Sequence, residues 1–547
     1  MKFGDGKQIK CLNAYGKEKV GINMTNTVIL NNFKAFFEDL KKNYKYSRLG
    51  KTFATTNNFY FYDTGTGKVL SVTLSVYKIL ECLLETDTFD SIFQLGIANE
   101  ELYASLQEIK EAVQNENILQ APPVLTMVGP QTHSLEETIY GDLKQITLEI
   151  TERCNFRCNY CIYSEGYESF REFGNKDMSF DVAQKAIDDL KNRSKNQKIV
   201  NIGFYGGEPL LRFPFIKECI NYAQEVIKDK ELTFTMTSNM SLMTAEIAKY
   251  FAGLKNKFVI LASIDGPELI HDKNRKYPNG EGTFNDVIVG LKCAFDAYNS
   301  AGKTDLIHLS MVIEKTGDYG KVLSEIKEFI QQTEWIPDNI TTNVAHRSVY
   351  LQPTEYTGIN SQEEKDYFSV GDAYADPILK WAKKENEDLL DRDRLYTSYY
   401  EEKIYYRIHD RPIYDKPMQF YPMNGCCVPF AKRTYVTAEG NYLICEKVGE
   451  TPDIGNVFTG LDIEKVKKYY VDDYINEATK YCGECWAINI CNECYLNCYD
   501  KNGINFCNRH LPCRANRYLI YQDLIMYHEI LESTPEKLQY LNQLEFE

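Results

Sequence analysis

The middle of the chain alternates short apolar, β-branched runs with longer stretches in which apolar residues recur at helical spacing. This alternation predicts parallel strand–helix–strand units. Six such units favour an α/β fold, a partial (β/α)6 TIM-like barrel over residues 143–352. Strands are expected at 145–151, 199–205, 232–237, 258–264, 307–313 and 341–350. Helices are expected at 179–194, 212–229, 243–253, 283–299 and 318–332.

The N-terminal part of the chain has a different pattern. Two aromatic and aliphatic runs, 58–63 and 69–72, flank a Gly-containing turn sequence and predict a β-hairpin. Helical periodicity follows near 74–86, 88–95 and 99–114. A hairpin with three short helices resembles a winged helix-turn-helix unit, which we place within residues 1–125. Residues 1–50 fit this unit poorly, so we expect them to form a helix-containing extension.

The remaining segments are distinguished by composition. A Pro-containing stretch begins a linker that we place at 126–142. Residues 353–420 are rich in charge and Tyr and are expected to form a helical linker. A cysteine-rich domain is expected at 421–515. The amphipathic pattern at the end of the chain predicts a C-terminal helix within 516–547.

Length, composition and charge restrict the class of protein. A chain of 547 residues is too long for one ordinary core, and its 44% hydrophobic and 26% charged content is typical of soluble globular proteins. We find neither an apolar run long enough to span a membrane nor a signal-peptide h-region, so we expect a cytoplasmic protein without a membrane partner. The net charge of −16 argues against nucleic-acid binding.

The 17 cysteines are not evenly spread. Three form a triplet at 154–161, and ten lie between Cys426 and Cys513. In a cytoplasmic chain such groups indicate metal ligands more than disulfides. The scattered thiols are expected to be small buried hydrophobes. These are Cys11, Cys82, Cys219 and Cys293.

The triplet Cys154, Cys158 and Cys161 has C-x3-C-x2-C spacing and directly follows the first predicted barrel strand. Three thiolates on one loop can bind three irons of a 4Fe–4S cluster and leave the fourth iron open for chemistry. Structural thiols or half of a zinc site would have the same spacing. The C-terminal end of a barrel strand is, however, where active sites of such barrels lie.

Two further motifs follow predicted strands. Gly206-Gly207-Glu208-Pro209 follows the second strand, and Ser263-Ile264-Asp265-Gly266-Pro267 ends the fourth. Paired glycines allow the backbone to approach a ligand closely, and Glu208 offers a carboxylate acceptor. The alternative is a tight turn with Pro209 at the first helical position. Asp265 could likewise simply cap a turn.

Together, the cysteine triplet, the GGEP element and the SxDGP element with Arg275 downstream resemble the radical S-adenosylmethionine (radical SAM) superfamily. The resemblance implies that the open iron chelates the amine and carboxylate of S-adenosylmethionine (SAM), whose reductive cleavage yields a 5′-deoxyadenosyl radical. It also implies that seven residues contact or surround SAM. These are Tyr160 near the adenine, Gly206, Gly207 and Glu208 at the amino group, Ser238 at the third strand, and Ser263 and Arg275 at the ribose or carboxylate.

The C-terminal cysteines resemble the SPASM domain, which holds two auxiliary 4Fe–4S clusters, so that three clusters are expected in all. By resemblance, Cys427 and Cys445 bind the first auxiliary cluster, and Cys482, Cys485 and Cys491 bind the second. We expect Cys494 or Cys498 to complete the first and Cys513 the second. Two clusters need at most eight thiolates, so Cys426 and Cys507 are expected to be spare. A zinc ribbon is the alternative, although the Cys485–Cys491 spacing is short for one.

The resemblance implies an enzyme that modifies a ribosomally synthesised precursor peptide, whose leader adds a strand to the N-terminal unit. Cys thioether cross-linking, as in sactipeptide and ranthipeptide maturases, is the expected reaction, with flavodoxin or ferredoxin as reductant. Carbon–carbon cross-linking, epimerisation, residue excision and anaerobic sulfatase maturation are alternatives. An iron–sulfur scaffold or electron carrier is a further alternative, but it would not need a SAM pocket. The sequence identifies no catalytic acid or base.

Overall fold

We describe a computed structural model of the chain. It describes residues 10–11, 26–161, 163, 173–314, 318–337, 340–346, 373–381, 383, 404, 407–423, 425, 427–448, 451–494, 498–500, 502–505 and 510–543. Most of the predicted helical linker at 353–420 therefore lies outside the described residues, although residues 373–381 form a helix.

The central sheet contains six consecutive parallel strands, each hydrogen-bonded to the next, and the sheet is open. They are β6 (Gln145–Thr151), β7 (Ile199–Gly206), β8 (Glu231–Ser238), β9 (Phe258–Ser263), β10 (Ile307–Ile313) and β11 (Thr342–His346). The helices between them are α6 (Phe180–Arg193), α7 (Phe213–Val226), α8 (Ala245–Gly253), α9 (Glu268–Asn274), α10 (Phe284–Ser300) and α11 (Tyr319–Gln332). The predicted strands and helices are confirmed, although residues 347–350 of the last strand lie outside the described residues.

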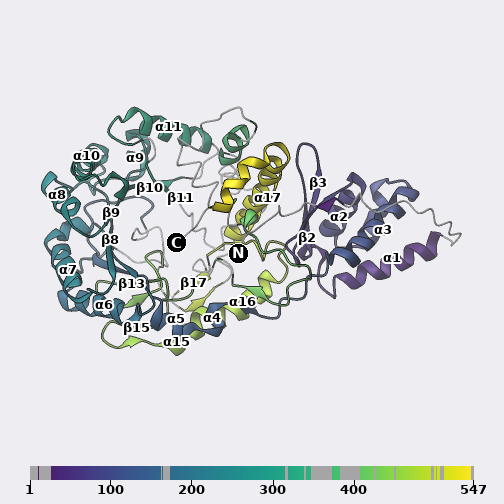
Figure 1. The fold of residues 1–547 in the computed structure, drawn as a ribbon, viewed down its shortest axis with the longest axis horizontal. Helices are drawn as coiled ribbons and strands as arrows, with labels where there is room; N and C mark the ends of the chain where they lie inside the picture. Colours follow the sequence, from purple (N-terminus) through teal and green to yellow (C-terminus); the bar gives the residue numbers. More distant parts are fainter. Residues whose placement is uncertain are drawn as a thin grey trace.

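The two faces of this sheet differ in polarity because strand side chains alternate. On β7 and β8, every second residue from Val200 to Phe204 and from Leu232 to Met236 is apolar and buried in the main core. Figure 1 shows the helices in an arc outside the strands, against this apolar face. The other face carries polar residues such as Asn201 and Thr235, which hydrogen-bond each other at 2.9 Å. The inner face of the arc is therefore suited to polar ligands.

A hairpin from the cysteine-rich segment extends the same sheet. β13 (Arg433–Val436) pairs parallel with β6, and β14 (Tyr442–Leu443) pairs antiparallel with β13. Buried Glu149 joins the two parts, because its carboxylate accepts hydrogen bonds from Tyr435 Oη at 3.0 Å and from Ala438 N at 3.0 Å. The sequence did not predict this extension.

The N-terminal sheet has three antiparallel strands, β2 (Gly50–Ala54), β3 (Phe59–Asp63) and β4 (Val69–Val72), with β1 (Lys10–Cys11) parallel to β4. Helix α1 (Asn26–Leu40), the 3-10 helix η2 (Tyr46–Arg48), helix α2 (Leu74–Thr86), the 3-10 helix η3 (Phe89–Leu95) and helix α3 (Asn99–Glu116) accompany it. The hairpin and the three helical segments are thus confirmed. This unit has a hydrophobic core of its own, in which Phe37 of α1 is fully buried.

The hairpin turn between β3 and β4 is buried against the C-terminal part of the chain. Thr64 Oγ1 donates to Trp486 O at 2.8 Å, and Asn489 Nδ2 donates to Thr64 O. Thr66 O and Gly65 O accept backbone N–H groups from residues 414 and 418 at 2.9 and 3.0 Å. The turn fixes the N-terminal sheet beside the cysteine-rich segment.

Short elements and one long helix complete the described chain. They are β5 (Met127–Val128), α4 (Pro130–His133), α5 (Leu135–Gly141), η4 (Pro209–Arg212), η5 (Thr304–Leu306), β12 (Tyr421–Pro422), β15 (Gly455–Asn456), β16 (Gly460–Leu461), α15 (Ile463–Lys467), η7 (Lys468–Asp472), α16 (Asp473–Cys482), β17 (Tyr499–Asp500), β18 (Gly503–Ile504), α17 (His510–Ser533) and η10 (Pro535–Gln543). The expected C-terminal helix is confirmed as α17, which begins earlier than predicted. Within the described ranges, no helix has both the length and the hydropathy to cross a bilayer.

Candidate functional site

Backbone hydrogen bonds hold the cysteine loop on two sides. On one side, Gly207 N donates to Thr151 O at 2.8 Å, and Glu208 N donates to Arg153 O at 2.9 Å. On the other side, Arg157 N and Asn159 N donate to the carbonyls of residues 276 and 274 at 2.7 and 2.9 Å. The loop that follows β6 is therefore fixed between the end of β7 and the end of helix α9.

The two glycines of the GGEP element allow its backbone to pack closely against the cysteine loop. A Cβ on Gly207 would lie 2.1 Å from Arg153 O, and one on Gly206, whose φ is +129°, would lie 2.3 Å from Thr151 O. Both contacts are with backbone atoms, which cannot move aside as a side chain can. The glycines therefore allow the backbone to pack closely against the cysteine loop, and their close approach to a ligand stays a prediction.

Glu208 is fully buried and its carboxylate accepts three hydrogen bonds. Oε1 accepts from Ser238 Oγ at 2.8 Å and Leu210 N at 3.0 Å, and Oε2 accepts from Asn239 N at 2.7 Å. Burial raises the pKa of Glu208 to about 7, although these hydrogen bonds act in the opposite direction. Its charged form would be stabilised by a cation placed beside it. Ser238, predicted to contact SAM, contacts Glu208.

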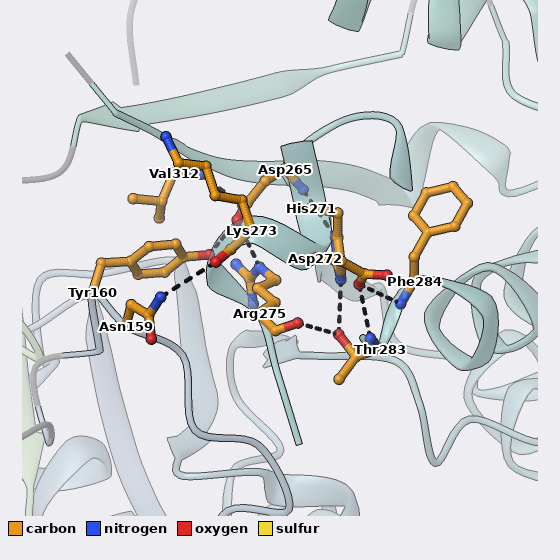
Figure 2. Close-up of polar contacts among 10 residues, drawn as sticks. All are labelled: Asn159, Tyr160, Asp265, His271, Asp272, Lys273, Arg275, Thr283, Phe284 and Val312. Atoms are coloured by element: carbon orange, nitrogen blue, oxygen red, sulfur yellow. Dashed lines mark hydrogen bonds and ion pairs between the residues drawn. The ribbon is translucent and has the colours of Figure 1, made fainter. Parts of the chain in front are cut away.

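Asp265 connects the other side of the site (Figure 2). Its Oδ2 accepts hydrogen bonds from Tyr160 Oη and from Arg275 Nε, the latter at 3.0 Å, while Oδ1 accepts from Val312 N at 2.9 Å. Arg275 also lies 5.4 Å from the centre of the Tyr160 ring. Two predicted SAM residues, Tyr160 and Arg275, are thus held together by a carboxylate that the sequence suggested could be a turn cap.

His271 supports this network in its neutral form. Burial, followed by the charge of Arg275, lowers the pKa of His271 to about 3. Nδ1 accepts from Asp265 N at 3.3 Å, so Nε2 carries the proton and donates to Thr283 Oγ1 at 3.1 Å. Thr283 Oγ1 in turn donates to Arg275 O at 3.0 Å (Figure 2). This chain fixes the backbone at Arg275.

The thiols of the triplet lie in an electrostatically coupled group. Burial, and after it the nearby charge of Glu208, raises the pKa of Cys154 to about 12. Burial also raises the pKa of Cys158 to about 12, against the opposing charge of Arg275. Glu208 and Arg275 therefore lie on the two sides of the cysteine loop. Binding of iron to these thiols requires loss of their protons.

Ser263, the remaining predicted SAM residue, lies at the end of β9 and is largely buried. Asn239 and Asn155, which help to organise the site, were not among the residues predicted to contact SAM, and Asp265 was considered as a possible turn cap. Asn239 Nδ2 donates to Asn155 Oδ1 at 2.9 Å, which ties the end of β8 to the cysteine loop. The only sequence signal for these residues was their position directly after predicted strands.

A second group of cysteines lines one cavity of about 260 Å³. Cys482, Cys485, Cys491 and Cys513 contribute to its wall, together with Arg514 and Arg517. These four thiols are the set that the sequence assigned to the second auxiliary cluster. Soft thiolates are the ligands that iron–sulfur clusters use, so the cavity fits such a group.

The cysteines assigned to the first auxiliary cluster are less clearly grouped in the structure than those of the second. Burial raises the pKa of Cys445 to about 12, and the charge of Glu446 and, to a smaller extent, that of Cys494 act in the same direction. Gly425 lies against the backbone of residues 492–493, which brings the segment leading to exposed Cys427 close to Cys494. Cys498 is fully buried. Cys426 and Cys507, the expected spares, lie outside the described residues.

The scattered cysteines lie in different environments. Cys219 is fully buried as predicted, whereas Cys82 and Cys293 are partly exposed and the side chain of Cys11 lies outside the described residues. In the part of the chain that the structure describes, no three His, Cys, Asp or Glu side chains converge on a position for one metal ion.

Fold and site define a class: an open parallel β/α sheet whose carboxyl edge carries a three-cysteine loop between a buried glutamate and a buried Asp–Arg pair. Residues 148–311 match the family described as the Radical SAM superfamily. This match covers less than a third of the chain, and in this segment the chain is similar to that superfamily.

Curated relatives match part of the chain. An uncharacterized protein of Methanocaldococcus jannaschii is 36% identical over 149 residues, which are 27% of this chain and 48% of that protein. The serine-type anaerobic sulfatase-maturating enzyme of Bacteroides thetaiotaomicron is 30% identical over 139 residues, 25% of this chain and 33% of the relative. The chain thus spans less than half of the length of each of these relatives.

A solved structure extends the likeness in fold. Tagged anSMEcpe with bound AdoMet superposes with a TM-score of 0.52 at 19% identity, covering 74% of this chain and 96% of that chain. At this identity the similarity shows the fold alone.

Proposed function

We propose that this chain is a radical SAM peptide maturase that forms thioether cross-links at Cys residues of a ribosomally synthesised precursor peptide. The observation that carries the first part of the proposal is the cysteine loop held between Glu208 and the Asp265–Arg275 pair. When bound, a 4Fe–4S cluster at Cys154, Cys158 and Cys161 together with SAM would supply a 5′-deoxyadenosyl radical for hydrogen abstraction.

The chain's own residues would bind and orient SAM. Glu208 is a buried carboxylate next to the cysteine loop, so it can accept a hydrogen bond from the SAM ammonium group. Arg275, held through Nε by Asp265, can donate from its Nη groups to a carboxylate or ribose oxygen. Tyr160 offers a ring face for the adenine beside Arg275, and Ser263 adds a hydroxyl at the end of β9.

We assign the auxiliary clusters on the same grounds. The second would be bound by Cys482, Cys485, Cys491 and Cys513, which the thiol-lined cavity supports. The first would be bound by Cys427, Cys445 and Cys494, which the packing of Gly425 against the backbone of residues 492–493 supports. Cys498 remains an alternative ligand of the first cluster. A low-potential protein such as flavodoxin or ferredoxin would supply electrons.

The leader of the precursor would bind along β4 of the N-terminal sheet. Asp63 N donates to Lys68 O at 2.9 Å, so these two residues form a hydrogen-bonded pair of the β3–β4 ladder. Hydrogen-bonded and non-hydrogen-bonded pairs alternate along an antiparallel ladder. Ser71, three positions after Lys68, is therefore in a non-hydrogen-bonded pair, and its backbone N–H and C=O point away from β3. The opposite edge is less accessible, because the segment after β2 is bonded to Glu529 and Glu532 of α17. β1 pairs with Leu70 and Ser71 at this edge, so the edge accepts a parallel strand, and the leader would take the place of β1 there.

The distinguishing experiment is mass spectrometry of a candidate Cys-containing peptide incubated anaerobically with the reconstituted protein, SAM and a reductant. Thioether formation predicts the loss of two hydrogens for each modified Cys, with the modified thiols resistant to alkylation. The same mass loss with all thiols still reactive would indicate carbon–carbon linkage and would refute the thioether assignment.

Anaerobic sulfatase maturation is a second candidate, because curated relatives with that activity match this chain. One of them is the cysteine-type enzyme of Clostridium novyi, which is 27% identical over 156 residues. These residues are 27% of this chain and 40% of that enzyme. It predicts conversion of a Cys or Ser in a sulfatase peptide to an aldehyde, which a hydrazide probe detects. A sulfatase peptide converted by this protein, with no thioether formed in the precursor peptide, would favour this second function.

A further inference from the structure

The amide of Asn516 faces one of the thiols that line the second cysteine cavity. Asn516 lies in α17, is largely buried, and places its Nδ2 atom 3.4 Å from Cys491 Sγ. The backbone N–H of Glu493 donates to the same sulfur at 3.4 Å. The sulfur of Cys491 therefore accepts one side-chain and one backbone hydrogen bond.

Arg407 fixes which end of this amide faces the sulfur. Its Nη2 atom donates to Asn516 Oδ1 at 2.8 Å. A guanidinium group has only donors, so the Asn516 atom that faces it must be the carbonyl oxygen. The amide NH₂ group is therefore left to face Cys491.

The arginine is itself held in place by buried partners. Its Nη1 atom pairs with Asp523 Oδ2 at 3.1 Å, and the two side chains are 5% and 0% exposed. Its Nη2 atom also donates to Asn492 Oδ1, in the loop between Cys491 and Cys494. Because the charge of Arg407 is balanced and its position fixed, the orientation of Asn516 is fixed as well.

We propose that Asn516 tunes the reduction potential of the cluster bound at Cys491, and that Arg407 is the positioning residue that holds Asn516 in its donating orientation. One-electron reduction adds negative charge to the cluster and its sulfur ligands. A donor aimed at a ligand sulfur stabilises the more negative state, so this hydrogen bond raises the potential. The inference rests on the proposed auxiliary cluster at Cys482, Cys485, Cys491 and Cys513.

The test compares two buried asparagines close to the same site. Asn516→Leu removes the donor with little change in side-chain volume. Asn489→Leu is the matched control, because Asn489 is as buried as Asn516 and lies two residues before Cys491, but its Nδ2 donates to Thr64 O. The full-length chain carries Cys154→Ala, Cys158→Ala and Cys161→Ala in each case, which leaves only auxiliary clusters. The second cluster is identified by the EPR signal that is lost when Cys485→Ala is added.

The readout is the midpoint potential of that signal, measured by EPR during stepwise reduction with dithionite, with iron content measured in parallel. We expect Asn516→Leu to shift the midpoint to a more negative potential and Asn489→Leu to leave it unchanged. Full iron content with the same potential in both variants would overturn the inference while leaving the proposed cluster intact. Absence of a signal sensitive to Cys485→Ala would instead refute the proposed cluster, and with it the inference.

A second variant and a direct measurement cover the case in which Asn516→Leu does not fold. Arg407→Lys keeps the positive charge but loses the two-pronged geometry, so we expect a shift of the same sign and smaller size. In the same chain with isotopically labelled asparagine, pulsed EPR should detect a nitrogen coupled to the cluster that Asn516→Asp removes. A coupling unchanged by that substitution would contradict the assignment.

Discussion

At the scale of single residues, the site depends on buried charges whose partners come from distant parts of the sequence. Glu208 is satisfied by Ser238 and by Asn239, and Asp265 by Tyr160 and Arg275. Such groups are stable inside a protein only when they are hydrogen-bonded or paired. Their protonation and hydrogen bonding can therefore be tested one side chain at a time.

Glu208→Gln should weaken SAM binding, because the amide keeps the shape of the carboxylate but loses the charge that attracts an ammonium group. A charge-assisted hydrogen bond is worth about 2–3 kcal/mol, so Kd should rise by roughly 30- to 160-fold. Isothermal titration calorimetry on protein with its clusters reconstituted measures this change. An unaltered Kd would remove Glu208 from the proposed SAM site.

His271 should make stability depend on pH. Its pKa is lowered to about 3 in the folded protein, from an ordinary value of 6.5. Above pH 6.5 His271 is neutral in both the folded and the unfolded chain, so it does not lower the stability. Below pH 6.5 His271 binds a proton in the unfolded chain but not in the folded protein. Stability should fall by about 1.4 kcal/mol per pH unit as pH drops from 6.5 towards 3.

His271→Gln tests this expectation. Between pH 7.5 and pH 5, the loss of unfolding free energy in urea should be about 2 kcal/mol smaller than in the wild type. His133→Gln, at an exposed position on α4, serves as the control. Equal losses in wild type and His271→Gln would show that His271 is not held neutral.

At the scale of elements, strand ends and loops are positioned by backbone contacts that side-chain patterns do not reveal. The GGEP element follows β7 as predicted, but its glycines pack against the cysteine loop. Strand β13, which extends the sheet beside β6, has only four residues and gave no sequence signal.

Gly207→Ala should displace the cysteine loop, because the new Cβ would lie 2.1 Å from Arg153 O. We expect the variant to lose the iron of the triplet cluster and about 1–3 kcal/mol of stability. Iron analysis and urea unfolding measure the two effects. Gly253→Ala is the matched control, since a Cβ there would meet nothing within 4 Å. Full iron content in Gly207→Ala would contradict the expectation.

Ser71→Pro should weaken leader binding, because proline removes the N–H group of β4 that faces β1, the position proposed for the leader, without breaking the β3–β4 ladder. Fluorescence anisotropy with a labelled leader peptide would measure a loss of at least tenfold, about 1.4 kcal/mol. Ala54→Pro is the control on the opposite edge: Thr55 N donates to Asn58 O, so the N–H of Ala54 also points outward. Equal binding by Ser71→Pro and wild type would exclude the β4 edge.

At the scale of the whole molecule, the N-terminal sheet is joined to the cysteine-rich segment through the turn at 64–67. Arg411 Nε donates to Gly67 O at 2.9 Å, and the ring of Tyr62 lies 6.1 Å from that of Trp486, next to Cys485. The proposed leader-binding sheet is thus fixed relative to the proposed second cluster (Figure 1).

Gly67→Ala should loosen this junction. Gly67 has φ of +71°, and a Cβ would lie 2.1 Å from Pro412 O. Gly96→Ala is the matched control, because Gly96 has φ of +68° but would meet nothing within 4 Å. Each variant should lose about 1 kcal/mol of unfolding free energy, because alanine is unfavourable in the left-handed conformation. Gly67→Ala should lose more, because its Cβ also clashes with Pro412 O. Hydrogen exchange at residues 411–418 should rise in Gly67→Ala alone; equal exchange would show that the turn does not anchor the sheet.

The sequence by itself determined the secondary structure of the sheet and the identity of the thiols. Hydrophobic periodicity is a local property of the sequence, so the bounds of strands β6 to β10 and of their helices could be predicted to within a few residues. The spacing of cysteines within one loop is also local and is the same in the sequence and in the folded protein. Only the tertiary structure decided which polar groups meet. The pairing of Asp265 with Tyr160, of Glu208 with Ser238, and of Asn516 with Cys491 joins residues 105, 30 and 25 positions apart. Such contacts depend on how strand ends and helices pack, and no local pattern encodes that packing.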